Sequence, residues 1–335
     1  MGTIQKGVKK TNWLGFILFI FLIIIVPVLG FNSFIITQAT FAGIYAIIAI
    51  GLGLLMGYTG QISLGQAAFY GVGAYTTAIL TSTYGFSPWV GLLFAVLLPA
   101  AIAFIVGYTM SRLSGYYLAM ATLSFGIIVS ALIMEWRSVT NGASGFYGIP
   151  SINFLGYNLS QGVGYYYFVW FFTIIAILFS LNIVHSRIGR ALRSIHDSEI
   201  AANSMGVNTG KYKMQIFVFS AMLAGLAGWL FAHMSYSISP QSFGLDASIL
   251  FLTMVVLGGS TSIWGALLGS LLITIINVTV HFLGENISFI TSDFEHVING
   301  LILILVIMFM PKGLFPSLVD LYRKITKKRI TSNVT

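Results

Sequence analysis

The chain is organised around long runs of apolar residues that short polar breaks separate. Each run is continuously hydrophobic rather than alternating, which is typical of membrane-spanning helices and not of lipid-facing strands. Nine runs predict full crossings, although the last is short: Trp13–Leu29, Phe34–Met56, Ala67–Thr83, Trp89–Met110, Tyr116–Met134, Tyr165–Val184, Met214–Tyr236, Trp264–Leu283 and Val297–Met310. The pattern therefore predicts an all-α, polytopic transmembrane helical bundle.

A tenth apolar segment, Ala247–Leu257, is too short to cross a bilayer as a helix. It would rise only about 16 Å, roughly half of the hydrocarbon core. Gly258, Gly259 and Ser260 follow it, so one interpretation is a broken crossing, half helix and half Gly-rich chain. The other interpretation is one tilted helix from Leu245 to Ile263.

Small residues recur at four-residue spacing within several of these segments. Such pairs let two helices approach closely. We expect close packing at Gly53 and Gly57, at Ala221 and Gly225, and at Gly265 and Gly269.

Basic residues flank the apolar part of the chain at both ends. The segment 1–12 contains three lysines and the tail 311–335 contains a cluster of Lys and Arg, and cytoplasmic flanks of membrane proteins are enriched in both. Both termini are therefore predicted to be cytoplasmic, so the number of crossings must be even. About ten spans within a membrane domain 13–310 satisfy this condition and place the loop 185–213 in the cytoplasm. Only Arg137 is discordant.

Composition agrees with a membrane protein and excludes several classes of site. Hydrophobic residues make up 57% of the chain and charged residues 7%, against about 25% charged in a soluble domain. The net charge is +8. The basic residues that produce it lie at the predicted membrane edges rather than on a soluble face, so no nucleic-acid site is expected. The absence of cysteine excludes disulfides and thiolate chemistry, and the scattered histidines predict no metal site.

Two uncharged, Gly-rich breaks interrupt the apolar runs. Irregular backbone at membrane depth persists only where protein or a water-filled cavity satisfies its polar groups, so such breaks are candidate elements of a translocation pathway. Ordinary cytoplasmic turns are the other interpretation. The first break, 57–66, contributes Gly57, Gly60, Ser63, Gly65 and Gln66, and the second, 258–265, contributes Gly258 and Gly259. Tyr117 and Thr122 add polar atoms to the fifth span, either for a solute or for helix packing.

The loop 185–213 is the only sizeable polar segment predicted to face the cytoplasm. Its apolar positions recur on one helical face and predict a short amphipathic helix along the membrane: Leu192, Ile195, Ala202 and Met205. Asp197 and Glu199 stand near the start of a final short helix, and Gly206 suits its C-terminal stop. A positive loop beside a membrane is usually an orientation signal that attracts anionic lipid. The two carboxylates among the basic residues favour docking to a protein instead.

The sequence Gly206-Val-Asn-Thr-Gly-Lys211 resembles a phosphate-binding loop only superficially. It has three residues between the glycines where that motif needs four, and Tyr212 stands where Ser or Thr should hold magnesium. The chain is therefore not expected to hydrolyse nucleotide or to be an enzyme.

Three stretches of the chain, 57–75, 189–206 and 254–265, resemble the LivM-type permeases of branched-chain amino acid ABC importers. The spacing Glu199-x-Ala-Ala-x-x-x-Gly206 is similar to the coupling motif of many ABC permeases. The resemblance implies contacts with an ATPase at Gly189, Arg190, Arg193, Asp197, Glu199, Ala201, Ala202 and Gly206. Two departures from the family pattern are Gln66, where His is expected, and Ser260-Thr261, where Gly is commoner.

The same resemblance implies the partners of the chain. They are a second, LivH-type permease, two cytosolic ATPases that hold ATP and magnesium, and an extracytoplasmic solute-binding protein. The chain itself would bind no cofactor and would lie among the lipids of a prokaryotic cell membrane.

The implied solute is a branched-chain or other hydrophobic amino acid, and urea or a short amide is the alternative within the family. An ion-coupled transporter or channel is a further alternative, although such proteins usually keep ionisable residues within their spans. Here only His233 and His281 approach span ends. No Arg in the spans stands out as a carboxylate ligand, which leaves a buried helix N-terminus at a Gly break as a candidate.

Overall fold

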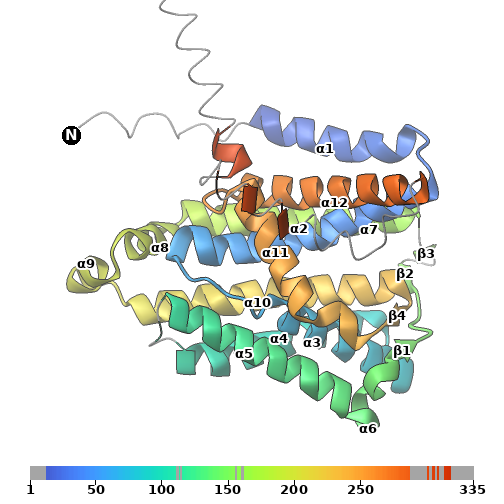
Figure 1. The fold of residues 1–335 in the computed structure, drawn as a ribbon, viewed down its shortest axis with the longest axis horizontal. Coiled ribbons are helices and arrows are strands. Elements are labelled where there is room, and N and C mark those ends of the chain that lie inside the picture. The colour runs from blue at the N-terminus through green and yellow to red at the C-terminus, as the bar shows by residue number, and fades with distance from the viewer. Residues whose placement is uncertain are drawn as a thin grey trace, which may run out of the picture.

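The computed structural model describes residues 13–110, 113, 115–154, 157–159, 162–286, 300–301, 304–305, 308 and 313–317. Most of this chain is helical, and the long helices lie side by side (Figure 1). The α-helices are α1 Trp13–Val28, α2 Ser33–Thr59, α3 Gln66–Ala78, α4 Pro88–Met110, α5 Tyr116–Glu135, α6 Arg137–Thr140, α7 Val163–His185, α8 Arg187–Asp197, α9 Glu199–Ser204, α10 Thr209–Ser235, α11 Leu245–Gly258 and α12 Ile263–Asn286. A π-helical turn, Ile79–Thr83, continues α3, and 3-10 turns lie at Gly142–Ser144 and Pro240–Phe243.

The apolar runs predicted to be helical are helical wherever the structure describes them. Six helices in the described part of the chain are long and apolar enough to cross a bilayer: α2, α4, α5, α7, α10 and α12. The apolar helices Phe19–Val28 and α11 are shorter. The predicted span Val297–Met310 falls mostly outside the described residues, as do the basic segment 1–12 and most of the tail 311–335.

The centre of the bundle is formed by α2 and α10. The helix α10 packs against α3 and α4, and α2 packs against α7, α10 and α12. Trp229 of α10 is buried, and its indole N–H donates to the Pro88 carbonyl at 2.9 Å. In contrast, α4 and α5 present rows of exposed apolar side chains on the outside of the bundle. Such surfaces suit lipid or another subunit rather than water.

The small residues at four-residue spacing lie at close helix contacts, as predicted. A methyl group on Gly225 of α10 would overlap the Ala95 carbonyl oxygen of α4, and one on Gly269 of α12 would overlap the Met254 carbonyl oxygen of α11. Backbones approach this closely only where no Cβ intervenes.

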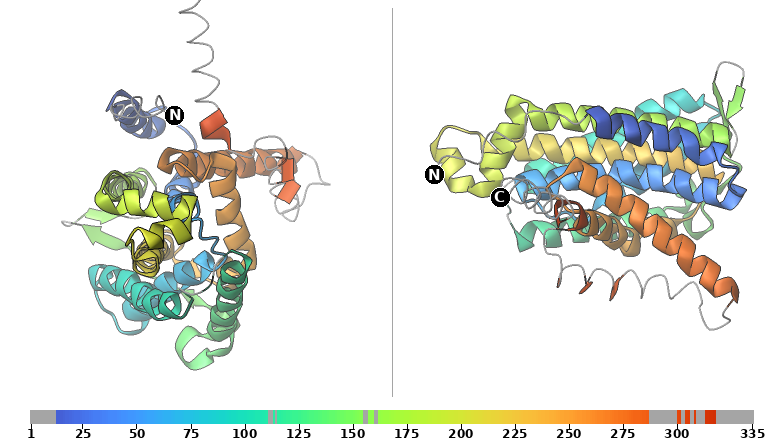
Figure 2. Two further views of the ribbon diagram at one scale, coloured as in Figure 1. Left: turned by 90° about the vertical axis from the view of Figure 1, so that its left-hand side faces the viewer. Right: turned by 90° about the horizontal axis from the view of Figure 1, so that it is seen from above.

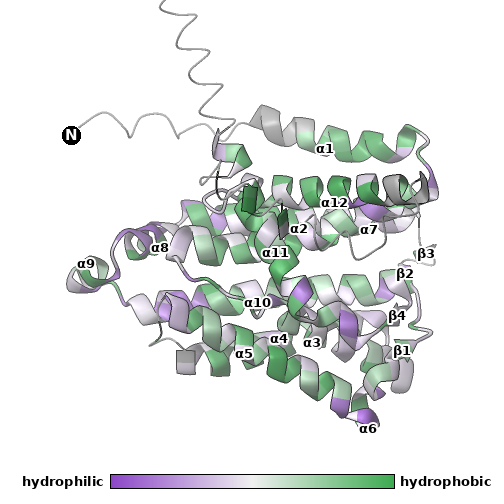
Figure 3. Cartoon of the chain, viewed as in Figure 1, coloured by the Kyte–Doolittle hydropathy of each residue, from purple (hydrophilic) through white to green (hydrophobic). Residues whose placement is uncertain are grey.

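The polar residues gather at the two ends of the bundle (Figure 3). The helices α8 and α9 form one end, and α6 lies at the other. Two small antiparallel strand pairs also lie at the end that carries α6: β1 Phe146–Tyr147 with β4 Ser237–Ile238, and β2 Ile152–Phe154 with β3 Tyr157–Leu159. An all-α prediction misses these strands. Gly145 adopts a positive φ of 68°, where a Cβ would overlap the Ile238 carbonyl oxygen, so glycine lets the connection leave the helical path and pair.

The helix that contains Ala247 ends at a break, as one of its two interpretations predicts, and whether the segment crosses the membrane stays a prediction. The helix α11 ends at Gly258, Gly259 takes a φ of 106°, and α12 begins at Ile263. A single helix from Leu245 to Ile263 is therefore wrong, because Gly259 adopts a backbone conformation that other residues avoid. The helix α11 runs at an angle to the rest of the bundle, from α12 towards α5 (Figure 2).

Candidate coupling loop and translocation pathway

The loop 185–213 folds as two short helices rather than one. Ser186 caps α8, its hydroxyl oxygen accepting from the Ile188 N–H at 3.0 Å, and Ser198 caps α9 by accepting from the Ala201 N–H at 3.3 Å. Serine at such positions stabilises a helix start because it satisfies a backbone donor without an intrahelical partner. The predicted single amphipathic helix is thus wrong, and Asp197 ends α8 instead of standing at the start of the second helix.

Three of the four apolar positions predicted to share a buried face are buried, although they lie on two helices. Leu192, Ile195 and Ala202 are buried. Met205 is instead 85% exposed, because α9 ends at Ser204 and Gly206 turns the chain with a φ of 85°. The predicted stop at Gly206 is confirmed.

The helix α8 is folded back tightly against the end of α7. Gly189 is buried, and a methyl group there would overlap the Val184 carbonyl oxygen. The Arg193 guanidinium donates to the same oxygen at 3.3 Å. Arg190 is exposed, so of the two predicted contact arginines Arg193 also serves to hold α8 in place.

Glu199 is paired within its own chain. Its carboxylate forms an ion pair with the ammonium group of Lys213 on the first turns of α10. Lys213 is only 4% exposed, whereas the Glu199 side chain is partly open to solvent. A charge-assisted bond to a buried ammonium is among the stronger polar contacts in proteins. The pair therefore fixes α9 to α10, and Lys213 is a site residue that the sequence alone did not reveal.

The outer surface of α9 is unexpectedly apolar. Ile200 is 83% exposed beside the exposed Met205, and Ala201 is exposed between them. This helix lies at one end of the bundle, beyond the ends of the long helices (Figure 1). Exposed apolar side chains on a polar end of a protein are typical of an interaction site. Neither Ile200 nor Met205 was a predicted contact, since periodicity alone placed Met205 on the buried face.

The first break connects this end of the molecule to the middle of the bundle. The helix α2 ends at Thr59, and Gly60 takes a left-handed φ of 68° next to His196 of α8. The chain then reaches α5, where the Leu64 N–H donates to the Thr122 hydroxyl at 3.0 Å and Gly65 leaves no room for a side chain against the Thr122 carbonyl. The helix α3 begins directly afterwards.

The two breaks lie against each other. A methyl group on Gly57 of the first break would overlap the Ser260 carbonyl oxygen of the second. Within the second break, a methyl group on Gly258 would overlap the Gly265 carbonyl oxygen. This contact was not predicted, because the breaks occupy unmatched places along the chain.

The remaining predicted pathway residues differ in their surroundings. Gln66 is buried, and its amide N–H donates to the Ser220 hydroxyl of α10 at 3.1 Å. The Ser63 hydroxyl is buried without a described partner. Tyr117 is largely exposed on the outside of α5, so it lines no cavity within this chain.

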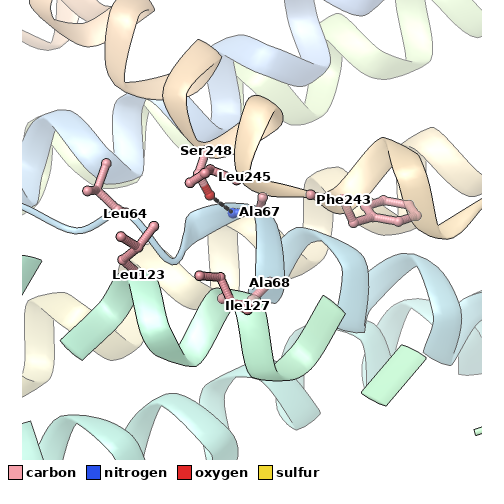
Figure 4. Close-up of a pocket in the computed structure, with 10 residues that line it drawn as sticks. Leu64, Ala67, Ala68, Leu123, Ile127, Phe243, Leu245 and Ser248 are labelled. Atoms are coloured by element: carbon pink, nitrogen blue, oxygen red, sulfur yellow. Dashed lines mark hydrogen bonds between the residues drawn. The ribbon is translucent and has the colours of Figure 1, made fainter. Parts of the chain in front are cut away.

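A small pocket lies between the N-termini of α3 and α11 and one face of α5 (Figure 4). Its cavity volume is only about 10 Å³, and its walls are mostly apolar. Leu64, Leu123, Ile127, Phe243 and Leu245 line it together with Ser248. Sequence reasoning singled out none of these six residues. The available signal was Gly244, a glycine directly before a helix.

Known proteins are similar in sequence to this chain over most of its length. Residues 34–307 match the family described as the permease component of branched-chain amino acid transport systems. The chain belongs to this family. The family is one of transport permeases, and with its long apolar helices the chain is a multi-pass membrane protein.

Among similar proteins is the high-affinity branched-chain amino acid transport system permease protein LivM of Escherichia coli (strain K12). It is 33% identical over 301 residues, covering 83% of this chain and 69% of the relative. The corresponding LivH of Salmonella typhimurium (strain LT2) is 26% identical over 292 residues, covering 82% and 92%. The chain is thus a permease similar to both types of subunit and more similar to LivM. No solved structure is significantly similar to it.

Proposed function

We propose that this permease is the LivM-type subunit of an ABC importer for branched-chain amino acids. It would form the translocation pathway with a second, LivH-type permease and would receive solute from an extracytoplasmic binding protein. Two similar proteins support this proposal, since both LivM and LivH are named as permeases of branched-chain amino acid transport systems. Two cytosolic ATPases, which bind ATP and magnesium, would supply the energy.

The proposed topology is ten spans in the cell membrane with both termini in the cytoplasm. The domains would be a cytoplasmic segment 1–12, a membrane domain 13–310 and a cytoplasmic tail 311–335. The helix α1 has its N-terminal end directed towards the α9 end of the bundle and its C-terminal end at the opposite end (Figure 1), which supports placing 1–12 and the loop 185–213 on one side. The basic character of both flanks supports calling that side cytoplasmic.

The loop 185–213 is proposed to be the coupling loop, with α9 inserted into the ATPase. ATP binding would close the ATPases and displace α9. That movement can reach the spans only if α9 is fixed to them, since coupling requires contacts that differ between two states. The ion pair of Glu199 with Lys213 and the packing of Gly189 supply this attachment. The exposed Ile200 and Met205 carry the proposal, because they are apolar groups that only a partner would cover.

The test of this docking is co-purification of the ATPases with the tagged permease. The double variant Ile200→Asp and Met205→Asp should lose the ATPases while still assembling with the second permease. Tyr147→Asp is the matched control, since Tyr147 is a similarly exposed large side chain at the opposite end of the molecule. Retention of the ATPases by the double variant would refute docking through α9.

The solute is tested by uptake into vesicles that contain the assembled importer and its binding protein. Uptake of leucine, isoleucine or valine that depends on ATP is the expected result. Uptake of urea or a short amide without these amino acids would instead support the alternative solute class.

A further inference from the structure

The first break is attached to the rest of the chain at both of its ends. Near its start, a methyl group on Gly60 would lie 3.7 Å from the ring of His196 on α8. At its last residue, the Gln66 side-chain amide donates to the Ser220 hydroxyl of α10 at 3.1 Å. The break therefore joins the proposed coupling loop, through α8, to a central helix of the bundle.

Ser220 lies on the face of α10 that also carries Lys213. The two residues are seven positions apart, which is about two turns of a helix and places both on one side of it. Both side chains are buried, and α10 is one continuous helix from Thr209 to Ser235. Because the Lys213 ammonium is paired with Glu199 of α9, a pull on α9 reaches Lys213 and, through the same helix, Ser220.

The attachment at Gln66 is a single hydrogen bond, and it lies beside buried groups that have none. The amide oxygen of Gln66 and the hydroxyl of Ser63 are both buried without a hydrogen-bond partner among the described residues. Buried polar groups left unpaired are costly, so an arrangement of the break that pairs them competes with the present one. Coupling between distant sites requires an element with two such arrangements. These unpaired groups indicate that the end of the break at Gln66 is the part that rearranges.

Resting on the proposed function, we propose that Gln66 and Ser220 are a positioning pair that carries the movement of the coupling loop into the translocation pathway. Movement of α10 would pull on the Gln66 amide and, with it, on the start of α3 and the Gly-rich chain before it. The bond between the Leu64 N–H and the Thr122 hydroxyl of α5 holds the middle of the break, so the pull changes the shape of the break instead of moving it as a whole. Neither member of the pair needs to touch the solute for this role.

The first test measures how many leucine molecules the assembled importer moves for each ATP that it hydrolyses, in vesicles with saturating binding protein. Gln66→Met keeps a side chain of similar length without the donor, and Ser220→Ala removes the acceptor. Either variant should lower this ratio at least about fivefold, the lower end of common coupling free energies between sites, while ATP hydrolysis continues. Gln66→His should keep a ratio near that of the wild type, because an imidazole N–H can also donate to a hydroxyl.

Ser270→Ala is the matched control, since Ser270 is also buried but donates to the Leu267 carbonyl of its own helix at 2.8 Å. An unchanged ratio in Gln66→Met and Ser220→Ala would overturn the proposal even if both activities fell, because a purely structural role lowers uptake and hydrolysis together. A low ratio in Gln66→His would overturn it as well. A wild-type importer that moves no leucine would instead overturn the proposed function.

A second test measures the rearrangement of the break independently of uptake. The chain contains no cysteine, so Ser63→Cys places a single thiol of this subunit in the break. Its labelling by a maleimide reagent is timed in the assembled importer with and without ATP. The two rates should differ severalfold, and adding Gln66→Met should make them equal. Equal rates in Ser63→Cys alone, or a difference that survives Gln66→Met, would overturn the proposal.

Discussion

The carboxylate of Glu199 at the start of α9 is paired with the ammonium group of Lys213 at the start of α10. The helix α10 lies at the centre of the bundle, where it packs against α2, α3 and α4. A displacement of α9 is therefore passed to a central helix of the membrane domain through one polar contact and a short connection. The pair makes the loop 185–213 a mechanical extension of the bundle.

Glu199→Gln should loosen this connection. The buried Lys213 would lose its carboxylate, which costs about 1.5–3 kcal/mol for a charge-assisted hydrogen bond. We expect faster trypsin cleavage within 187–213 and several-fold lower uptake. Asp197→Asn is the control for cleavage, because Asp197 is exposed at the end of α8.

The double variant Glu199→Gln and Lys213→Met tests whether the two side chains act as a pair. Removing both partners also removes the unpaired buried charge, so trypsin should cleave the double variant after Arg187, Arg190 and Arg193, which both variants keep, no faster than it cleaves Glu199→Gln. If Glu199→Gln and Lys213→Met each speed this cleavage and the double variant shows the sum of the two effects, the residues act independently.

Gly189→Ala should separate α8 from α7, because the added methyl group would overlap the Val184 carbonyl oxygen. The expected result is a permease that inserts normally but transports poorly, measured as ATP-dependent uptake per assembled complex. Gly210→Ala provides the control, since its Cβ would meet only the Asn208 side-chain oxygen at 4.0 Å. Similar uptake by the two variants would argue against a tight attachment of α8.

Gly57→Ala should destabilise the membrane domain by forcing the two breaks apart. The methyl group would meet the Ser260 backbone, which cannot rotate away as a side chain can, and overpacking of this kind costs about 1–3 kcal/mol. Thermal denaturation in detergent should show a lower Tm than the wild type. Gly164→Ala is the control, with only the flexible Leu159 side chain nearby at 3.4 Å. A normal Tm for Gly57→Ala would contradict the packing of the breaks.

The local pattern of apolar residues and glycines was sufficient to predict the long helices and several of the positions where they end. Continuous apolar runs predicted the long helices. The chain turns at Gly60, Gly206 and Gly259, because each adopts a positive φ that glycine tolerates. The serine caps that divide the loop into α8 and α9 were also visible locally. The prediction missed this division because it continued one helical periodicity across Ser198, and it therefore placed the exposed Met205 on the buried face.

Contacts between distant segments were not predictable from one sequence. Three such contacts join separate elements: the pairing of Glu199 with Lys213, the contact of Gly57 with Ser260 and the bond between Ala67 and Ser248. Periodicity describes one element at a time, so it cannot place a polar residue opposite its partner on another. For this reason the pocket was missed, and Tyr117 was included although it faces outwards.

The docking of α9 into an ATPase is the central claim, and the absence of cysteine makes it directly measurable. Met205→Cys introduces a single thiol at the exposed end of α9 for a photoactivatable maleimide reagent, and Tyr147→Cys places one at the opposite end. In the assembled importer, Met205→Cys should crosslink to the ATPase and Tyr147→Cys should not. Crosslinks from Met205→Cys to lipid or to the other permease, with none to the ATPase, would contradict the account.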